Sequence, residues 1–150
     1  MPNRNDYPSS VAELLDDRMK FKPAALRAVK ALARSRPWRS NIEDRKEKFR
    51  SLNRALAAAY ELPEPQLVFG KLNGGDSGRS CYIPPMNVII ISGTLSVVTF
   101  LHEWGHVRGM NERKACRWSV NLFRRVFPKS WARVTCDGHM VRQARSPDAS

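Results

Sequence analysis

The sequence contains few acidic residues, few histidines and few cysteines, and it has no long uninterrupted apolar run. Its longest apolar stretch, residues 87–101, is broken by Ser92, Gly93 and Thr94. It therefore falls short of the roughly 20 residues that a membrane-spanning helix needs. The first ten residues, MPNRNDYPSS, lack the apolar segment of a secretory signal peptide. We therefore predict a cytoplasmic protein with no membrane partner.

Cysteine is too scarce for a disulfide framework. The sequence has three cysteines, Cys81, Cys116 and Cys136, an odd number without zinc-knuckle spacing, which predicts free thiols in a reducing compartment. At 150 residues the chain has the length of one ordinary domain and can bury a core. We predict one domain over residues 1–150, with disordered ends at 1–8 and 145–150.

The chain has 26 Lys and Arg but only 14 Asp and Glu, which gives it a net charge of +12. Such an excess favours polyanions, whether nucleic acid, an anionic membrane surface or an acidic protein. The basic residues are spread over 18–54, 108–133 and 142–145, and no nucleic-acid-binding motif appears. Nucleic acid is therefore one candidate partner, and a solvated basic surface without a partner is the alternative.

The residues that can carry chemistry concentrate in residues 94–123, TLSVVTFLHEWGHVRGMNERKACRWSVNLF, with HEWGH at 102–106. Positions i and i+4 lie one above the other on a helix, so His102 and His106 would direct two imidazoles toward one metal ion. Glu103 would flank the same ion, where it can take a proton from a metal-bound water. The spacing therefore predicts a metal-dependent hydrolase.

The context of the motif indicates a buried helix. Gly109 follows it, and the whole reads as a helix of about 15 residues that ends with a glycine in the C′ position. Gly105 leaves room for a close neighbour. Two histidines without a ligand role are the alternative, although they would suit a more polar helix. The apolar residues before the motif are Val97, Val98, Phe100 and Leu101.

A catalytic zinc normally has three protein ligands and a water, so a third ligand is needed. Glu112, six residues after His106, is the nearest candidate. Alternatively, it merely caps a helix that begins near Asn111. Residues 102–112, read as HExxHxxGxxE, resemble the metzincin signature with a carboxylate in the last position. Read with the following helix, ERKACRWS from residue 112, the stretch resembles the glutamate helix of gluzincins, especially phage-associated ImmA/IrrE-type metallopeptidases.

We favour the gluzincin-like interpretation, because the only downstream candidate for the methionine turn of metzincins is Met140, and the residues around it do not suit that turn. The resemblance covers residues 82–123. It implies an α+β, zincin-like fold with N-terminal helices, a small three-stranded, mostly antiparallel sheet, and an HExxH helix followed by a glutamate helix. Cys116 lies one turn after the glutamate, where those proteins often have a polar residue. The implied Zn²⁺ ligands are His102, His106 and Glu112, and the implied general base is Glu103.

The tail of the chain adds further candidates. His139 is the only other histidine, and it could stabilise an oxyanion, bind the metal or lie on the surface. An arginine is the alternative oxyanion stabiliser. Cys136 or Asp137 could instead bind the metal in a latent form of the protein.

Periodicity predicts the remaining elements. Ser9 or Ser10 would cap a short helix, Pro23 would open a second, and a capping box at 40–43 would start a long helix closed by Pro63. Strands are expected at 66–72, 79–83 and 87–92, with a glycine-rich loop at 73–78, and helices at 111–127 and 129–134. The strand at 79–83 or the one at 87–92 could hold an extended peptide substrate by strand addition.

The sequence thus predicts a zinc-dependent metallopeptidase that acts on a peptide or protein substrate. A different class remains open, a non-catalytic, zincin-like protein of a phage or mobile element that binds nucleic acid or a regulator. A protease that acts on proteins bound to DNA would combine both features.

Overall fold

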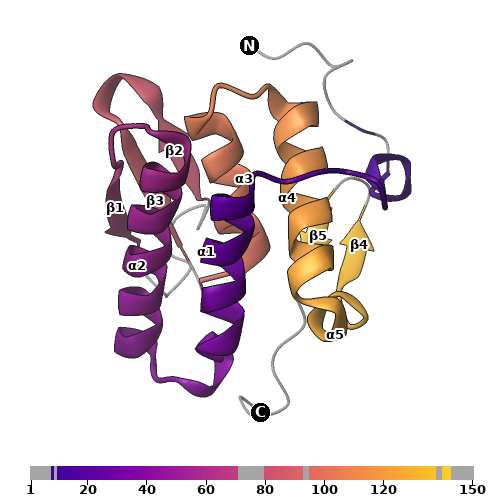
Figure 1. The fold of residues 1–150 in the computed structure, drawn as a ribbon, viewed down its shortest axis with the longest axis horizontal. Coiled ribbons are helices and arrows are strands. Elements are labelled where there is room, and N and C mark those ends of the chain that lie inside the picture. Colours follow the sequence, from indigo (N-terminus) through magenta and orange to yellow (C-terminus); the bar gives the residue numbers. More distant parts are fainter. Residues whose placement is uncertain (1–7, 9, 71–79, 93–94, 138–139, 143–150) are drawn as a thin grey trace. The chain divides into compact units, whose positions relative to one another are not determined.

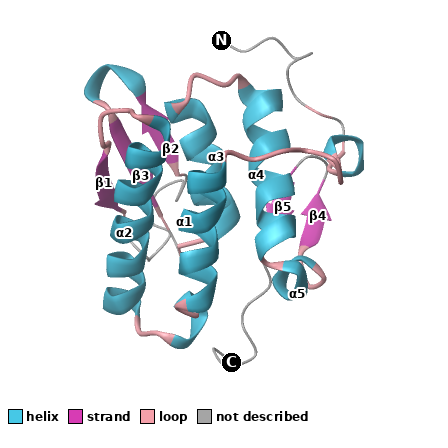
Figure 2. Cartoon of the chain, viewed as in Figure 1, coloured by secondary structure: helices cyan, strands magenta, loops and turns pink. Residues whose placement is uncertain are grey.

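The structure is a computed structural model that describes residue 8 and residues 10–70, 80–92, 95–137 and 140–142 (Figure 1). The chain divides into two compact units. The first unit comprises Met1–Lys20 and Ser96–Ala144, and the second comprises Phe21–Leu95 and Arg145–Ser150. Both helices and strands are present, as predicted for an α+β protein (Figure 2). The single domain expected from the chain length stays a prediction, and each unit is described by itself.

Two helices of the second unit, α1 (Pro23–Arg34) and α2 (Ile42–Tyr60), pack side by side (Figure 1). Pro23 suits the first turn of α1, where a backbone N–H has no helical partner. Asn41 caps α2, because its side chain accepts a hydrogen bond from the N–H of Asp44 at 2.9 Å. The predicted capping box therefore began one residue too early. Glu61, with φ 53°, turns the chain out of α2 before the prolines.

A three-stranded sheet completes the second unit, with β1 (Gln66–Phe69), β2 (Cys81–Ile83) and β3 (Val88–Ile91) in the order β1-β3-β2. β3 pairs antiparallel with β2 but parallel with β1, so the predicted mostly antiparallel sheet is half parallel. The apolar run of β3, VIII, suits a strand that is paired on both sides and mostly buried. Residues 71–79, which include the whole predicted glycine loop at 73–78, lie outside the described part.

The sheet order decides between the two strands that could hold an extended peptide. β3 is hydrogen-bonded on both sides, so the predicted strand at 87–92 has no edge to offer. Within the described residues, β2 has a strand partner on one side only. A short 3-10 helix, Pro84–Met86, and Asn87 with φ 50° connect the two strands.

The first unit is built on α3 (Val97–Val107) and α4 (Glu112–Val126), which pack against each other (Figure 1). α5 (Pro128–Trp131) is shorter than the predicted helix at 129–134. After it, β4 (Thr135–Asp137) pairs antiparallel with β5 (Met140–Arg142), and neither strand was predicted. In place of the N-terminal helix that Ser9 or Ser10 would cap, the chain makes a 3-10 turn, Ala12–Leu14. No helix of the described residues is long and apolar enough to cross a membrane.

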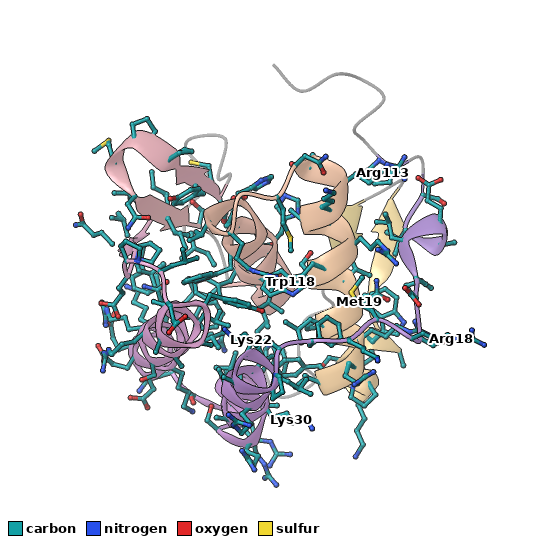
Figure 3. All side chains as sticks on the ribbon, turned by 45° about the horizontal axis from the view of Figure 1, so that its top comes forward. Arg18, Met19, Lys22, Lys30, Arg113 and Trp118 are labelled. Atoms are coloured by element: carbon teal, nitrogen blue, oxygen red, sulfur yellow. The ribbon has the colours of Figure 1, made fainter. Side chains whose placement is uncertain are left out.

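Asn121 of α4 attaches the N-terminal segment to this unit. It is 4% exposed, its amide Nδ2 donates to the carbonyl of Leu14, and its Oδ1 accepts from the N–H of Asp16, both at 2.8 Å. Ion pairs add to this attachment at the surface, where Arg113 is labelled in Figure 3. The pairs are Arg113 with Glu13, Arg117 with Asp16 and Arg124 with Asp17, at 3.3, 2.5 and 2.6 Å.

Replacing Asn121 by Ala should lower the free energy of unfolding by about 2 kcal/mol, because it leaves a buried carbonyl and an N–H without their partner. Urea denaturation measures the change. Asp17→Asn is the matched control, since it removes one exposed ion pair and should cost less than about 1 kcal/mol. Equal losses in the two variants would contradict the role assigned to Asn121.

Candidate metal centre

The helix that carries the HExxH motif ends in a Schellman turn. Gly109, in the predicted C′ position, has φ 84° and donates its N–H to the carbonyl of His106 at 2.9 Å. The N–H of Met110 donates to the carbonyl of Gly105 at 3.0 Å. This pair of bonds satisfies the last carbonyls of α3 and reverses the chain. The prediction of a glycine-terminated helix is confirmed, and α4 begins only a few residues later.

The same turn orients His106. Its Nδ1 lies 3.0 Å from the carbonyl oxygen of Met110, so a proton on Nδ1 is donated to that oxygen. A carbonyl cannot donate, and the contact therefore favours the tautomer in which Nε2 carries a lone pair. Metal-binding histidines commonly use one ring nitrogen in this way and bind the ion with the other.

Two imidazole nitrogens and one carboxylate meet at one point. Nε2 of His102 and Nε2 of His106 are 3.2 Å apart; the first lies 3.0 Å from Oε1 of Glu112 and the second 3.0 Å from its Oε2. Ligands held at about 2.0–2.2 Å from a tetrahedral zinc lie about 3.3 Å from one another, so the spacing fits this ion. Between 20% and 26% of each side chain is exposed, which leaves the group accessible to solvent.

Glu112 is free to serve as a ligand because another residue caps its helix. The side chain of Asn111 accepts a hydrogen bond from the N–H of Lys114 at 2.9 Å, which makes Asn111 the N-cap of α4. Glu112 occupies the first helical position, and its carboxylate reaches back to the two histidines of α3. The alternative in which Glu112 only caps the helix is therefore not what the structure shows.

The close approach of α3 and α4 depends on Gly105. A Cβ atom at this position would lie 2.8 Å from Cβ and 2.9 Å from Cα of Ala115, which is nearer than real carbon atoms pack. The close neighbour predicted for Gly105 is therefore α4. The absence of one side chain thus lets the carboxylate of α4 meet the imidazoles of α3.

The charges of the cluster stabilise one another. The hydrogen bond to Glu112 raises the pKa of His106 against the opposing effect of burial, and the negative charge of Glu103 contributes to the rise. Burial alone would raise the pKa of Glu112, but hydrogen bonds to His102 and His106 outweigh burial and hold it well below its usual range. The carboxylate is therefore ionised, as a metal ligand must be.

Cys116 lies beside two of the candidate ligands. Its buried Sγ is 3.6 Å from Nδ1 of His102 and 3.7 Å from a carboxylate oxygen of Glu112. Burial, together with the charge of Glu112, raises the pKa of Cys116 to about 12, so the thiol is neutral. Its position one turn after Glu112 was the only sequence signal for this contact.

The side chains of the candidate site residues in the tail fall outside what the structure describes. His139 lies outside the described residues. Cys136 and Asp137 belong to β4 and Met140 belongs to β5, but their side chains are also outside the description. The group of His102, His106 and Glu112 was predicted in full, and the structure brings all three together.

Comparisons with protein-family models, with curated proteins and with solved structures find no match to this chain. The function of the site must therefore be argued from its own geometry.

Replacing Gly105 by Ala should weaken zinc binding by about 10- to 100-fold, the loss typical of residues that support a ligand. The new methyl group would push α4, and Glu112 with it, away from the histidines. Competition with a chromophoric zinc chelator measures the affinity. Ala31→Ser is the control, since it also adds one heavy atom, but at an exposed residue of the other unit, and it should bind zinc like the wild type. Equal weakening in both variants would contradict the steric argument.

Replacing Glu112 by Ala should remove or sharply weaken zinc binding, whereas His139→Ala should retain one zinc per chain. The reason is that Glu112 supplies the third ligand atom of the cluster. Elemental analysis of the purified wild type and both variants measures the content. If His139→Ala loses zinc and Glu112→Ala keeps it, the third ligand lies in the tail of the chain and is not Glu112.

Proposed function

We propose that this protein is a zinc-dependent metallopeptidase of the zincin type, with His102, His106 and Glu112 as the zinc ligands and Glu103 as the general base. The observation that carries the proposal is the meeting of two imidazole nitrogens and a carboxylate within 3.2 Å of one another. The order of the residues along the chain adds support, because HExxH places a second carboxylate beside the first ligand.

The chemistry of the three donors favours zinc over the common hard cations. Magnesium and calcium take mainly oxygen ligands, whereas imidazole nitrogens suit zinc and other transition metals. When bound, zinc acts as a Lewis acid on a scissile carbonyl and brings the pKa of a coordinated water to about 7. Every other part of the reaction falls to side chains of the protein.

Glu103 is placed to move protons. It follows the first ligand on α3, its side chain is buried, and its negative charge acts on both His106 and Cys116. In the proposed reaction its carboxylate takes a proton from the attacking water and then donates it to the leaving amine. A buried carboxylate at this point is not required for a zinc ion that only supports the fold.

The ligand count also favours catalysis over a structural role. Structural zinc sites are typically closed by four protein ligands, whereas catalytic sites use three and leave a position open. Within the described residues, His102, His106 and Glu112 form a group of three, and Cys116 Sγ is not part of it. The partial exposure of these side chains suits a site that a substrate carbonyl must enter.

Replacing Glu103 by Gln should lower peptide hydrolysis by about 100- to 10,000-fold while zinc content stays at the wild-type level. The amide keeps the shape of the side chain but cannot accept the proton. Cleavage of a mixed fluorogenic peptide library and elemental analysis of the same samples measure the two effects.

Glu61→Gln is the matched control, because it makes the same chemical change at an exposed residue of the other unit. It should keep full activity. A wild type that holds zinc but cleaves no peptide, or a Glu103→Gln variant as active as the wild type, would overturn the peptidase proposal.

A further inference from the structure

The segment around α1 carries only positive charge. Between Asp17 and Glu43 the sequence contains no acidic residue. Within the same interval lie eight basic residues, Arg18, Lys20, Lys22, Arg27, Lys30, Arg34, Arg36 and Arg39. Residues 18–42 therefore carry a net charge of +8, in a chain whose net charge is +12.

On α1 the bases form one face. At 100° per residue, Arg27, Lys30 and Arg34 lie within about 60° of one another around the helix, and all three are exposed. We call these three residues the α1 basic face. Lys30 is labelled in Figure 3, as is Lys22 just before the helix. The opposite side of α1 is buried and consists of Ala25, Val29 and Leu32.

Six of the described basic residues outside α1 form ion pairs with acids. In the second unit, α2 pairs Lys46 with Glu43, Arg50 with Glu47 and Arg54 with Glu64. In the first unit, three arginines of α4 pair with the acids of residues 13–17. Among the described residues, no acidic side chain forms an ion pair with the α1 basic face.

The bases at the start of α2 have structural tasks instead. Lys48 donates from Nζ to the carbonyl of Ser35 at 2.7 Å and so caps the C-terminal end of α1. Arg45 donates from Nε to the carbonyl of Pro37 at 2.9 Å. These two cations hold the turn between the helices and add positive charge near Arg34. They leave the α1 basic face itself without a task in the fold.

We propose that the α1 basic face binds the phosphate backbone of duplex nucleic acid without reading its sequence. Charge complementarity carries the proposal, since three adjacent unpaired cations match a closely spaced row of anions. The face is about 10 Å long at 1.5 Å per residue, and duplex DNA carries one charge per roughly 1.7 Å of its axis. Several phosphates therefore lie within reach of the three side chains.

The composition of α1 favours a duplex over other polyanions. The helix, PAALRAVKALAR, has no aromatic residue on which unpaired bases could stack, and no Asn or Gln to read an adenine edge. A helix that lies in a membrane surface needs an exposed apolar side, but Ala25, Val29 and Leu32 are buried. A rigid, purely cationic face of this composition suits binding through the phosphate backbone of a duplex.

This inference is independent of the proposed peptidase activity, because it concerns the second unit and its test requires no zinc. The probe is a fluorescein-labelled 20-base-pair DNA of arbitrary sequence, and its anisotropy is followed on titration with the full-length protein at several salt concentrations. The test variant is Arg27→Gln/Lys30→Gln/Arg34→Gln. The matched control is Lys46→Gln/Arg50→Gln/Arg54→Gln, which removes the same charge from α2, where each base has an acidic partner.

The test variant should bind the duplex at least 10-fold more weakly than the control at 50 mM salt. Its slope of log affinity against log salt should be smaller by about 2 to 3, since each phosphate contact contributes about 0.9. Arg27→Lys/Arg34→Lys keeps the charge and should bind like the wild type. Thermal unfolding of all variants identifies any loss that comes from the fold.

Three outcomes would overturn the proposal. The first is a wild type that does not bind the duplex at 50 mM salt. The second is equal weakening in the test variant and the α2 control, which would make net charge alone responsible. The third concerns vesicles that contain 30% phosphatidylserine. If the protein binds them as tightly as it binds DNA, and the same substitutions abolish that binding, the α1 basic face binds a membrane surface.

Discussion

The candidate metal centre depends on the close contact between α3 and α4 at Gly105 and Ala115. A Cβ atom at residue 105 would come within 2.9 Å of the backbone of α4, so the two helices can approach this closely only because the side chain is missing. That distance sets where the first turn of α4 lies, and Glu112 is in that turn. Because core packing resists even small changes in volume, a displacement of α4 would be transmitted directly to the carboxylate.

Most of the site is assembled over a short length of chain. The Schellman turn after His106 reverses the backbone, presents the carbonyl of Met110 to one imidazole and starts α4 a few residues later. Asn111 takes over the capping of that helix and leaves the carboxylate of Glu112 for the histidines. Bringing the three side chains together costs little loop entropy, because Glu112 follows His106 by only six positions in the sequence. Contacts of 3.0 Å join the Glu112 carboxylate to both imidazoles across this turn.

Some basic residues interact with other groups of the fold, and others do not. Three arginines of α4 form ion pairs with acids of residues 13–17, and bases of α2 pair with neighbouring acids or cap the end of α1. The α1 basic face has none of these partners among the described residues. A net charge of +12 is therefore a poor guide to binding, since much of the positive charge already serves the fold. Only the pairing in the structure indicates which cations are available to an external anion.

Local features of the fold, which depend on residues close to one another in the sequence, were determined by the sequence alone. The i, i+4 spacing of the histidines, the glycine after α3 and the proline at the start of α1 act within one or two helical turns, so they predicted these helices. Glu112, six residues after His106, completed the predicted group of three that the structure brings together. Features that depend on which elements become adjacent were decided by the tertiary structure. The parallel pairing of β1 with β3, the hydrogen bonds of Asn121 and the contact of Cys116 with His102 are of this kind. No local pattern encodes them, because each partner lies on another element whose position follows from how the chain packs.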